Sequence, residues 1–451
     1  MDQPSNPSAA SISKATRDQV APLCGAQNNV WFHQAIDETN TSYNIGQAIH
    51  IDGKIDPQQL EASIRSLIDE TESLRLYFFS SEDQIYQGIN NNQRFHLNQW
   101  DLSDDLHQNK TAYSIIHDQQ SIRFNLSTGP CYRFGLIKLN ESKWILFWFL
   151  HHLIIDGVGC ANFLTRLAER YTTNDKRIEL TEPQWISVVN EDLLYRNSSA
   201  HTKDRKYWAD KLKGFGDPIS LSGKPFDDLS LDLPNAVNLQ LTRSKFDEIV
   251  AWSRAISQSN FAAFATAAAI YISRITNQFD ICIGVPSSGR KSKHQSLIGM
   301  LTNVLPLRIS FSEASTPENI TALISKDTLS SLRHGRFPLN EIIQDRRAQG
   351  GKIPFGFLIN LESFEHVLNF GTAQALVETI HSAPVADMEL FIFDRRDNGD
   401  VELRLEFNPS CYTSTEAQSH LNGIAKILLS ICDNSTKPVL ALPLLTSAER
   451  T

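Results

Sequence analysis

The chain has 451 residues, of which 41% are apolar and 21% charged, and it carries a formal net charge of −9. Such a composition is typical of a soluble globular protein, and the length favours two domains of about 200 residues each. The acidic balance and the absence of a basic run argue against a nucleic-acid partner, and no apolar run reaches the roughly 18 residues of a membrane span.

The cysteines and the N-terminus indicate the compartment. The six cysteines are scattered and form no CxxC pair, as expected of free, mostly buried thiols in a reducing compartment. The first residues contain no apolar segment of the kind found in signal peptides. We therefore expect a cytoplasmic monomer without a membrane partner.

The first half of the chain alternates helix and strand patterns. Residues 1–18 are rich in Ser, Asn and Ala, which predicts disorder. Apolar residues at helical spacing predict a helix over 58–70, followed by the strand-like LRLYFF. Residues 131–150 predict two strands joined by the turn LNES, and the second, KWILFWFL, is typical of a strand covered on both faces. A helix is predicted over 160–171, and the polar, irregular residues 172–190 are the candidate boundary between lobes.

The second half has the same mixed character. Residues 259–276 are Ala-rich and apolar nearly all round, which predicts a buried helix. Strands are predicted at 281–286 and 355–362, and MELFIFD and VELRLEFN are expected to pair through the turn DNGD. A helix is predicted over 415–431. Strands and helices in both halves predict two α/β lobes.

The stretch HHLIIDGVG directly follows the buried strand. Successive strand residues point to opposite faces, so only one of His151 and His152 faces a given cavity. An imidazole titrates near pH 7 and accepts the proton of an attacking amine or hydroxyl, while Asp156 orients a ring or braces a loop and Gly157 allows a tight turn. The residues alone leave open a structural pair, a catalytic base or a metal site, although no third ligand at metal spacing is evident.

HHLIIDGVG resembles the HHxxxDG signature of nonribosomal peptide synthetase condensation domains. Further stretches resemble motifs of the same family in the same order: APLCGAQNNVWFHQ (21–34), ESLRLYF (72–78), FNLSTGPCYRFGLIKL (124–139), CIGVPSSGR and IGMLTNVLPLRI (282–309), and HGRFPLNEII (334–343). The resemblance covers roughly residues 20–449, and the ordered series is much more specific than HHxxxDG alone.

The resemblance implies an α/β (α+β sandwich) fold with two chloramphenicol acetyltransferase-like lobes in a V-shaped pseudo-dimer, and an active-site tunnel between them. Beyond the disordered N-terminus, we expect an N-terminal lobe over 19–185, a C-terminal lobe over 186–441, and the start of a linker to an adenylation domain over 442–451. Donor and acceptor peptidyl carrier proteins would deliver their thioesters on phosphopantetheine arms. No bound cofactor and no metal are implied.

The resemblance also assigns roles within the motif. His152, the second histidine, is implied to be the catalytic residue that positions the acceptor amine and takes its proton. Gly157 would offer its backbone N–H to the developing oxyanion. His151 is implied to be structural, with its ring turned into the lobe.

Three further residues are implied to support the site. Asp156 would pair with an arginine from the other lobe, which matches Arg290, and a solvated surface charge is the alternative for that arginine. Asn360 resembles a polar residue that lines the tunnel, and a satisfied strand asparagine is the equally simple alternative.

The chain also departs from the family pattern at four positions. Asn29 stands where arginine is usual, Gly159 where serine is common, and Leu339 and Asn340 where aromatic or acidic residues are preferred. None of these changes touches His152, so the implied activity is amide-bond formation in natural product biosynthesis, with an unusual donor or acceptor as one reason for the departures.

Other functions remain open from the sequence. A stand-alone acyltransferase would use an acyl-CoA or a soluble amine or alcohol. An epimerization domain usually continues as DGVSWR where this chain has DGVGCAN, a non-catalytic recruitment domain typically loses the histidines, and a cyclization domain carries DxxxxD instead. No LGGxS carrier motif or adenylation motif is present, so we expect the carriers to come from elsewhere.

Overall fold

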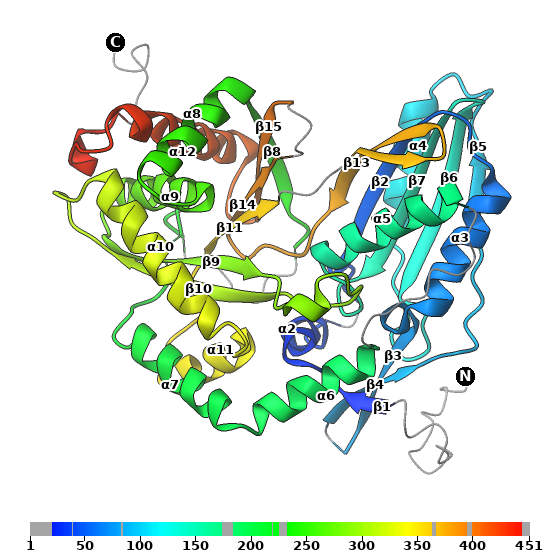
Figure 1. The fold of residues 1–451 in the computed structure, drawn as a ribbon, viewed down its shortest axis with the longest axis horizontal. Coiled ribbons are helices and arrows are strands. Elements are labelled where there is room, and N and C mark those ends of the chain that lie inside the picture. Colours follow the sequence, from blue (N-terminus) through cyan, green and yellow to red (C-terminus); the bar gives the residue numbers. More distant parts are fainter. Residues whose placement is uncertain are drawn as a thin grey trace. The chain divides into compact units, whose positions relative to one another are not determined.

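The computed structural model describes residues 20–37, 39–82, 84–173, 184–218, 220–224, 232–362, 367–394 and 399–443, and Figure 1 shows its ribbon. The chain divides into two compact units. The first runs through Ser198 and also contains Arg290–Leu301 and Leu368–Ser382, and the second contains the remainder. The segment predicted to be disordered, and nearly all of the predicted linker over 442–451, lie outside the described residues.

The first unit is built on a six-stranded sheet with the order β12-β13-β2-β7-β6-β5 and a three-stranded sheet with the order β1-β4-β3. The strands are β1 (Val20–Pro22), β2 (Asn44–Asp52), β3 (Leu76–Ser81), β4 (Gln84–Ile89), β5 (Asn98–Asp101), β6 (Tyr132–Asn140), β7 (Lys143–His151), β12 (Val367–Phe370) and β13 (Ala373–His381). β13 pairs with β2 in antiparallel register, so a part of the predicted C-terminal lobe, 186–441, completes the sheet of the first unit.

β7 lies in the middle of this sheet, paired antiparallel with β2 on one side and β6 on the other. Every residue from Trp144 to His151 is buried, which confirms the predicted strand with two covered faces. The predicted turn LNES joins β6 to β7, and within it the Ser142 N–H donates to Asn140 Oδ1 over 2.9 Å. The sheet therefore holds the two histidines at the buried end of its central strand.

The helices of the first unit are α2 (Gly25–Gln34), α3 (Pro57–Glu70), α4 (Gln108–Gln120), α5 (Gly157–Thr173) and α6 (Trp185–Arg196), with 3-10 turns η2 (Glu72–Arg75) and η3 (Ser292–His294). α5 buries Phe163, Leu164 and Leu167 as predicted, but it starts three residues earlier than the predicted 160. The prediction of irregular structure through residue 190 was wrong, because α6 begins at Trp185 and buries Val188 and Val189 at helical spacing.

The second unit contains a six-stranded sheet with the order β10-β9-β11-β14-β15-β8. Its strands are β8 (Asn235–Leu241), β9 (Asp280–Ser287), β10 (Asn303–Ser310), β11 (Phe357–Glu362), β14 (Met388–Phe393) and β15 (Val401–Phe407). Its helices are α7 (Ser199–Leu212), α8 (Arg243–Ala255), α9 (Asn260–Thr276), α10 (Pro317–Arg333), α11 (Leu339–Arg347) and α12 (Ser414–Asp433), with the 3-10 turn η4 (Val439–Ala441).

α9 is the predicted Ala-rich buried helix and lies at the centre of the second unit's core. Ser259 caps its first turn, and Asn277 ends it in the left-handed conformation with φ 54°. The predicted helix near the C-terminus is α12, which opens with a capping box formed by Thr413 and Glu416. Alternate residues of β11, β14 and β15 face this core, and the residues between them form the opposite face of the sheet.

Candidate functional site

His152 follows the last residue of β7, and its ring is fixed by the turn that follows. Its backbone N–H donates to the Tyr43 carbonyl over 2.9 Å, and its Nδ1 lies 2.7 Å from the Ile155 carbonyl oxygen. Because a carbonyl only accepts, Nδ1 carries the proton and Nε2 holds the lone pair of the neutral ring. Burial lowers the pKa of His152 and outweighs the opposing effects of the Ile155 carbonyl and Asp156. The ring is therefore neutral at pH 7, with Nε2 in the form of a base.

His151 lies on the buried side of the same strand end. The Leu153 N–H donates to its Nδ1 over 3.2 Å, so the proton sits on Nε2, which is 3.1 Å from Gln34 Oε1. Burial, and then the neighbouring His152, lower the pKa of His151 to about 3. Both ring nitrogens are engaged inside the unit, an arrangement that suits the structural role expected for this residue.

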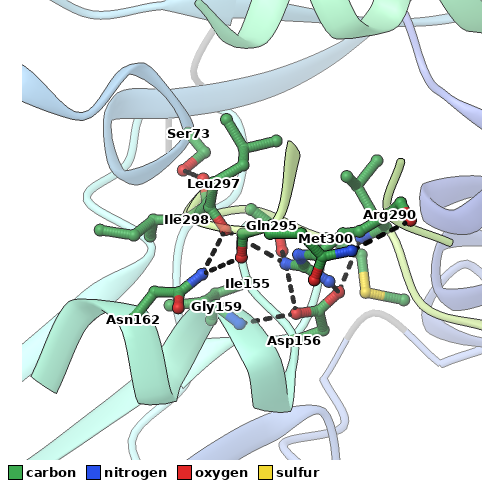
Figure 2. Close-up of polar contacts among 12 residues, drawn as sticks. Ser73, Ile155, Asp156, Gly159, Asn162, Arg290, Gln295, Leu297, Ile298 and Met300 are labelled. Atoms are coloured by element: carbon green, nitrogen blue, oxygen red, sulfur yellow. Dashed lines mark hydrogen bonds and ion pairs between the residues drawn. The ribbon is translucent and has the colours of Figure 1, made fainter. Parts of the chain in front are cut away.

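Asp156 ends the turn and forms a buried ion pair with Arg290, which Figure 2 shows in close-up. Arg290 Nη1 and Nη2 donate to the two carboxylate oxygens over 2.8 and 2.7 Å. The carboxylate also accepts the N–H groups of Gly159 (2.8 Å) and Leu301 (2.9 Å). Burial raises the pKa of Asp156, but the charge and hydrogen bonds of Arg290, together with the N–H groups of Leu301 and Gly159, more than offset this effect and the pKa is lowered. Asp156 is therefore ionised, and its partners surround it.

Arg290 belongs to the first unit, together with the rest of Arg290–Leu301. The sequence resemblance placed this arginine in the other lobe, whereas the structure packs it beside Asp156 within one compact unit. Arg290 also donates to the Gly299 carbonyl over 3.1 Å. The Ser73 hydroxyl holds the Ile298 carbonyl over 2.7 Å, so the segment is fixed at several points around the carboxylate (Figure 2).

Gly157 is the exposed first residue of α5. The first N–H groups of a helix have no acceptor within the helix and lie at the positive end of its dipole. Such N–H groups bind anions, so the position of Gly157 suits a donor to a developing oxyanion. Asn360 lies on β11 in the second unit, half-buried, and its amide donates to Glu362 Oε1 over 3.1 Å.

The family is decided by comparison with known sequences. Residues 17–451 match the family described as "Condensation domain". The chain belongs to the condensation-domain family. It is 27% identical over 418 residues to a dimodular nonribosomal peptide synthase of Bacillus subtilis, covering 92% of this chain and 18% of that protein. It is 24% identical over 420 residues to enterobactin synthase component F of Escherichia coli, covering 91% of this chain and 32% of that protein. The condensation domain therefore spans about a fifth to a third of the length of these relatives.

Solved structures of low sequence identity share the fold. A double mutant of the starter condensation domain of rhizomide synthetase, in complex with C8-CoA and Leu-SNAC, superposes with a TM-score of 0.87 at 24% identity, covering 96% of this chain and 99% of that one. The first condensation domain of the calcium-dependent antibiotic synthetase, bound to a substrate analogue, gives a TM-score of 0.85 at 22% identity, covering 95% and 99%. The predicted α/β condensation-domain fold is confirmed.

Among the described residues, no group of three or more His, Cys, Asp or Glu side chains is placed to hold a metal ion. None of the described helices has the length and apolar character needed to cross a bilayer. The six cysteines are free thiols, five of them buried, as the sequence predicted.

Close packing around position 159 explains why this condensation domain has a glycine there. A Cβ at this position would lie 2.8 Å from the Ile155 side chain and 3.1 Å from the backbone N and O of Gly299. The serine common in the family would therefore collide with the segment that carries Arg290. The glycine allows the close approach of α5 to that segment.

We expect Gly159→Ser to lower the free energy of unfolding by roughly 1–3 kcal/mol, because an added side chain in a packed contact forces its neighbours to shift. The midpoint of urea unfolding would measure the loss. Gly216→Ser is the matched control, since a Cβ there meets nothing within 4 Å. Equal midpoints for Gly159→Ser and the control would contradict the steric explanation.

A group of carboxylates lies in the second unit, on the sheet face opposite its core. Glu362 on β11, Glu389 on β14 and Glu406 on β15 are close enough to influence one another. Burial, and then Glu406, raise the pKa of Glu362 to about 7. The pKa of Glu389 is also raised well above its usual value by burial, Glu406 and Glu362. Glu362 and Glu389 therefore hold their protons to a higher pH in the folded condensation domain than an ordinary glutamate does.

The pH dependence of stability follows from the raised pKa of Glu362. A carboxyl with a higher pKa in the folded state stabilises it at low pH, and this contribution is lost as the pH rises from about 4.5 to about 7. We expect Glu362→Gln to match wild type at about pH 4, below the usual pKa of a glutamate, and to be more stable by about 1–3 kcal/mol at pH 8.5. Urea unfolding at both pH values tests this, with the exposed Glu313→Gln as control. A constant difference between wild type and Glu362→Gln across the range would contradict the assignment.

Four residues around the histidines were not identified from the sequence. The Tyr43 ring lies 6.4 Å from that of His151 and 6.5 Å from that of His152. Gln27, Gln87 and Trp185 form a buried hydrogen-bonded group that reaches the turn after His152. Only Gln27 lies in a stretch that resembled a family motif, and its pattern did not indicate its partners.

Proposed function

We propose that this condensation domain forms an amide bond by transferring an acyl or peptidyl group from a donor thioester to the amine of an acceptor aminoacyl thioester. Both thioesters would be carried on phosphopantetheine arms of carrier proteins. The observation that carries the proposal is the hydrogen bond from His152 Nδ1–H to the Ile155 carbonyl, 2.7 Å long, which leaves the Nε2 lone pair to accept a proton.

The reaction needs one proton to be moved between the two substrates. The amine nitrogen attacks the thioester carbonyl carbon, a C–N bond forms, and negative charge develops on the oxygen. His152 Nε2 takes the proton from the amine nitrogen. The carbonyl then re-forms, the C–S bond breaks, and the leaving sulfur receives that proton, so that the products are an amide and a free thiol.

Two features of the turn support this role. The lowered pKa keeps His152 neutral at pH 7, so it enters the reaction ready to accept a proton. Gly157 stands at the N-terminus of α5, where a backbone N–H stabilises negative charge on the thioester oxygen. The proton acceptor, His152, and the donor to the oxyanion, the Gly157 N–H, then lie at the two ends of one short turn.

The experiment is product analysis with defined thioesters. The domain is incubated with a panel of acyl-CoA and acyl-SNAC donors and aminoacyl-SNAC acceptors that includes C8-CoA and Leu-SNAC, the pair bound by the rhizomide starter domain. Mass spectrometry is expected to find an amide, with one equivalent of free thiol. Thiol release without an amide would identify a hydrolase and overturn the proposal. The absence of any product, both with this panel and with carrier-bound substrates, would overturn it as well.

A donor taken directly from coenzyme A is the second candidate, favoured by the C8-CoA complex of the rhizomide starter domain. The two donors are separated by comparing kcat/KM for one acyl group presented on a phosphopantetheinylated carrier and on coenzyme A. The proposal of carrier-borne donors predicts a higher kcat/KM for the carrier. A preference for coenzyme A would instead favour the stand-alone acyltransferase.

A further inference from the structure

Two glutamine side chains form a reciprocal pair in the interior of the first unit. The Gln27 amide donates to Gln87 Oε1 over 2.9 Å, and the Gln87 amide donates back to Gln27 Oε1 over 2.8 Å. Both residues are completely buried. Gln27 lies on α2 and Gln87 on β4, so the pair joins elements that are far apart in the sequence.

The remaining hydrogen-bonding capacity of the two amides is also used. Gln27 donates its second N–H to the Leu153 carbonyl over 3.0 Å and accepts the Cys24 N–H over 3.0 Å. Gln87 donates its second N–H to the Pro22 carbonyl over 2.9 Å and accepts the Trp185 Nε1–H over 2.8 Å. Each amide thus makes four hydrogen bonds, which fixes the orientation of both and makes a rigid buried network.

This network ends on the turn that orients His152. Gln27 donates to the carbonyl of Leu153, the residue directly after His152. Two residues further along the same turn, the Ile155 carbonyl accepts the hydrogen bond from His152 Nδ1–H. Displacing Leu153 would move Ile155, and with it the acceptor that selects the ring tautomer. The network therefore acts on His152 through the backbone and not through the ring.

Trp185 connects the same network to the other end of the turn. Its ring packs so closely on Gly299 that a Cβ there would lie 2.5 Å away. The Gly299 carbonyl accepts the N–H of Asp156 over 3.3 Å and Arg290 Nη2 over 3.1 Å. One set of contacts thus supports the turn at Leu153 and at Asp156.

We infer that Gln27, Gln87 and Trp185 are positioning residues that hold His152 in the Nδ1–H tautomer and so keep Nε2 as the proton acceptor. The effect on turnover rests on the proposed function, whereas the effect on the tautomer does not. The two parts are measured separately, by NMR of the imidazole and by steady-state kinetics.

The decisive variant is the double substitution Gln27→Met with Gln87→Met. Methionine is close to glutamine in length and volume, so the double variant removes both amides without opening a cavity and is expected to fold. It removes the donor to Leu153. With ¹⁵N-labelled histidine, and His152 assigned by loss of its signals in His152→Ala, we expect the Nδ1–H tautomer to dominate in wild type and to fall below half in the double variant.

Kinetics give the second readout. We expect kcat of the double variant to fall 10- to 100-fold, with KM changed less than threefold, because binding groups are untouched. Ile116→Val, a change in the buried face of α4, controls for general destabilisation and is expected to leave both the tautomer and kcat unaltered.

The outcomes separate the inference from the proposed function. An unchanged His152 tautomer in the double variant overturns the inference, whether or not kcat falls. A changed tautomer together with the fall in kcat supports both claims. A changed tautomer in a domain whose wild type forms no amide leaves the positioning role standing and rejects the proposed function.

Discussion

His152→Ala is expected to lower kcat for amide formation by a factor on the order of 10²–10⁴, the usual contribution of a positioned general base. The substitution removes the Nε2 lone pair and also the Nδ1–H bond to the Ile155 carbonyl. KM for either thioester is expected to change little, since the proton is transferred only after both substrates are bound.

The pH profile distinguishes a base from a merely structural histidine. Burial lowers the pKa of His152, so the neutral form persists to pH values below 6.5. The acid limb of kcat in the wild type is therefore expected below pH 6.5, with activity lost as the pH falls through the lowered pKa. His152→Ala is expected to lose that limb as well as most of its rate.

His107→Ala is the matched control, because His107 is exposed and makes no capping hydrogen bond at the start of α4. Its kcat and pH profile should coincide with those of wild type. If His152→Ala retains more than a tenth of the wild-type kcat and the same acid limb, the imidazole is not the base and the proposed mechanism fails.

The fold was largely predictable because its strongest patterns are local. KWILFWFL is a short run of apolar, partly aromatic residues at successive positions, which is typical of a strand buried on both faces, and β7 lies in the middle of its sheet. The Ala-rich run over 260–276 is apolar on all sides and became the central helix α9. In each case the length and composition of the apolar run indicated the element before any partner was known.

Such patterns could not predict that segments from the second half of the sequence pack in the first unit. Arg290–Leu301 and Leu368–Ser382 lie in the second half of the sequence but pack in the first unit. What holds them there is specific: a buried arginine on Asp156 for one, and antiparallel pairing with β2 for the other. Neither interaction produces a periodic pattern of residues that sequence analysis could detect.

The sequence predicted the residues of the site's motif but not the residues that hold the motif in place. The HHLIIDGVG stretch identified His152, His151, Asp156 and Gly157 because their types and spacing suit proton transfer and a tight turn. The amide pair of Gln27 and Gln87 carried no such signal, since a glutamine is usually exposed and its burial depends on partners 60 residues apart in the chain.

The largest effect on stability is expected from Asp156→Ala. Both members of the Asp156–Arg290 pair are buried, with side-chain exposures of 1% and 0%. Removing the carboxylate leaves a buried guanidinium without its counter-charge, which costs roughly 3–5 kcal/mol. We expect the variant to be insoluble or disordered, measured by the soluble fraction on expression and by urea unfolding of whatever remains soluble.

The control is Asp345→Ala, the same change in an ion pair whose arginine, Arg205, is 59% exposed. Exposed pairs contribute about 0–1 kcal/mol, so this variant should remain folded. Soluble, fully active Asp156→Ala protein would contradict the structural role of the pair.

A double substitution separates the charge from the other contacts of Asp156. In Asp156→Asn with Arg290→Met no buried charge is left. The N–H groups of Gly159 and Leu301 bond to different oxygens of the carboxylate, so the single amide oxygen of the asparagine keeps an acceptor for one of the two. We therefore expect the double variant to be more stable than Asp156→Ala by at least 2 kcal/mol, since the penalty of an unpaired buried ion is on the order of 3–5 kcal/mol. A double variant that is no more stable than Asp156→Ala would show that the charge of Asp156 is not what matters. The hydrogen bonds that the carboxylate accepts from α5 and from Leu301 would then be what holds Arg290–Leu301 against the turn that carries His152.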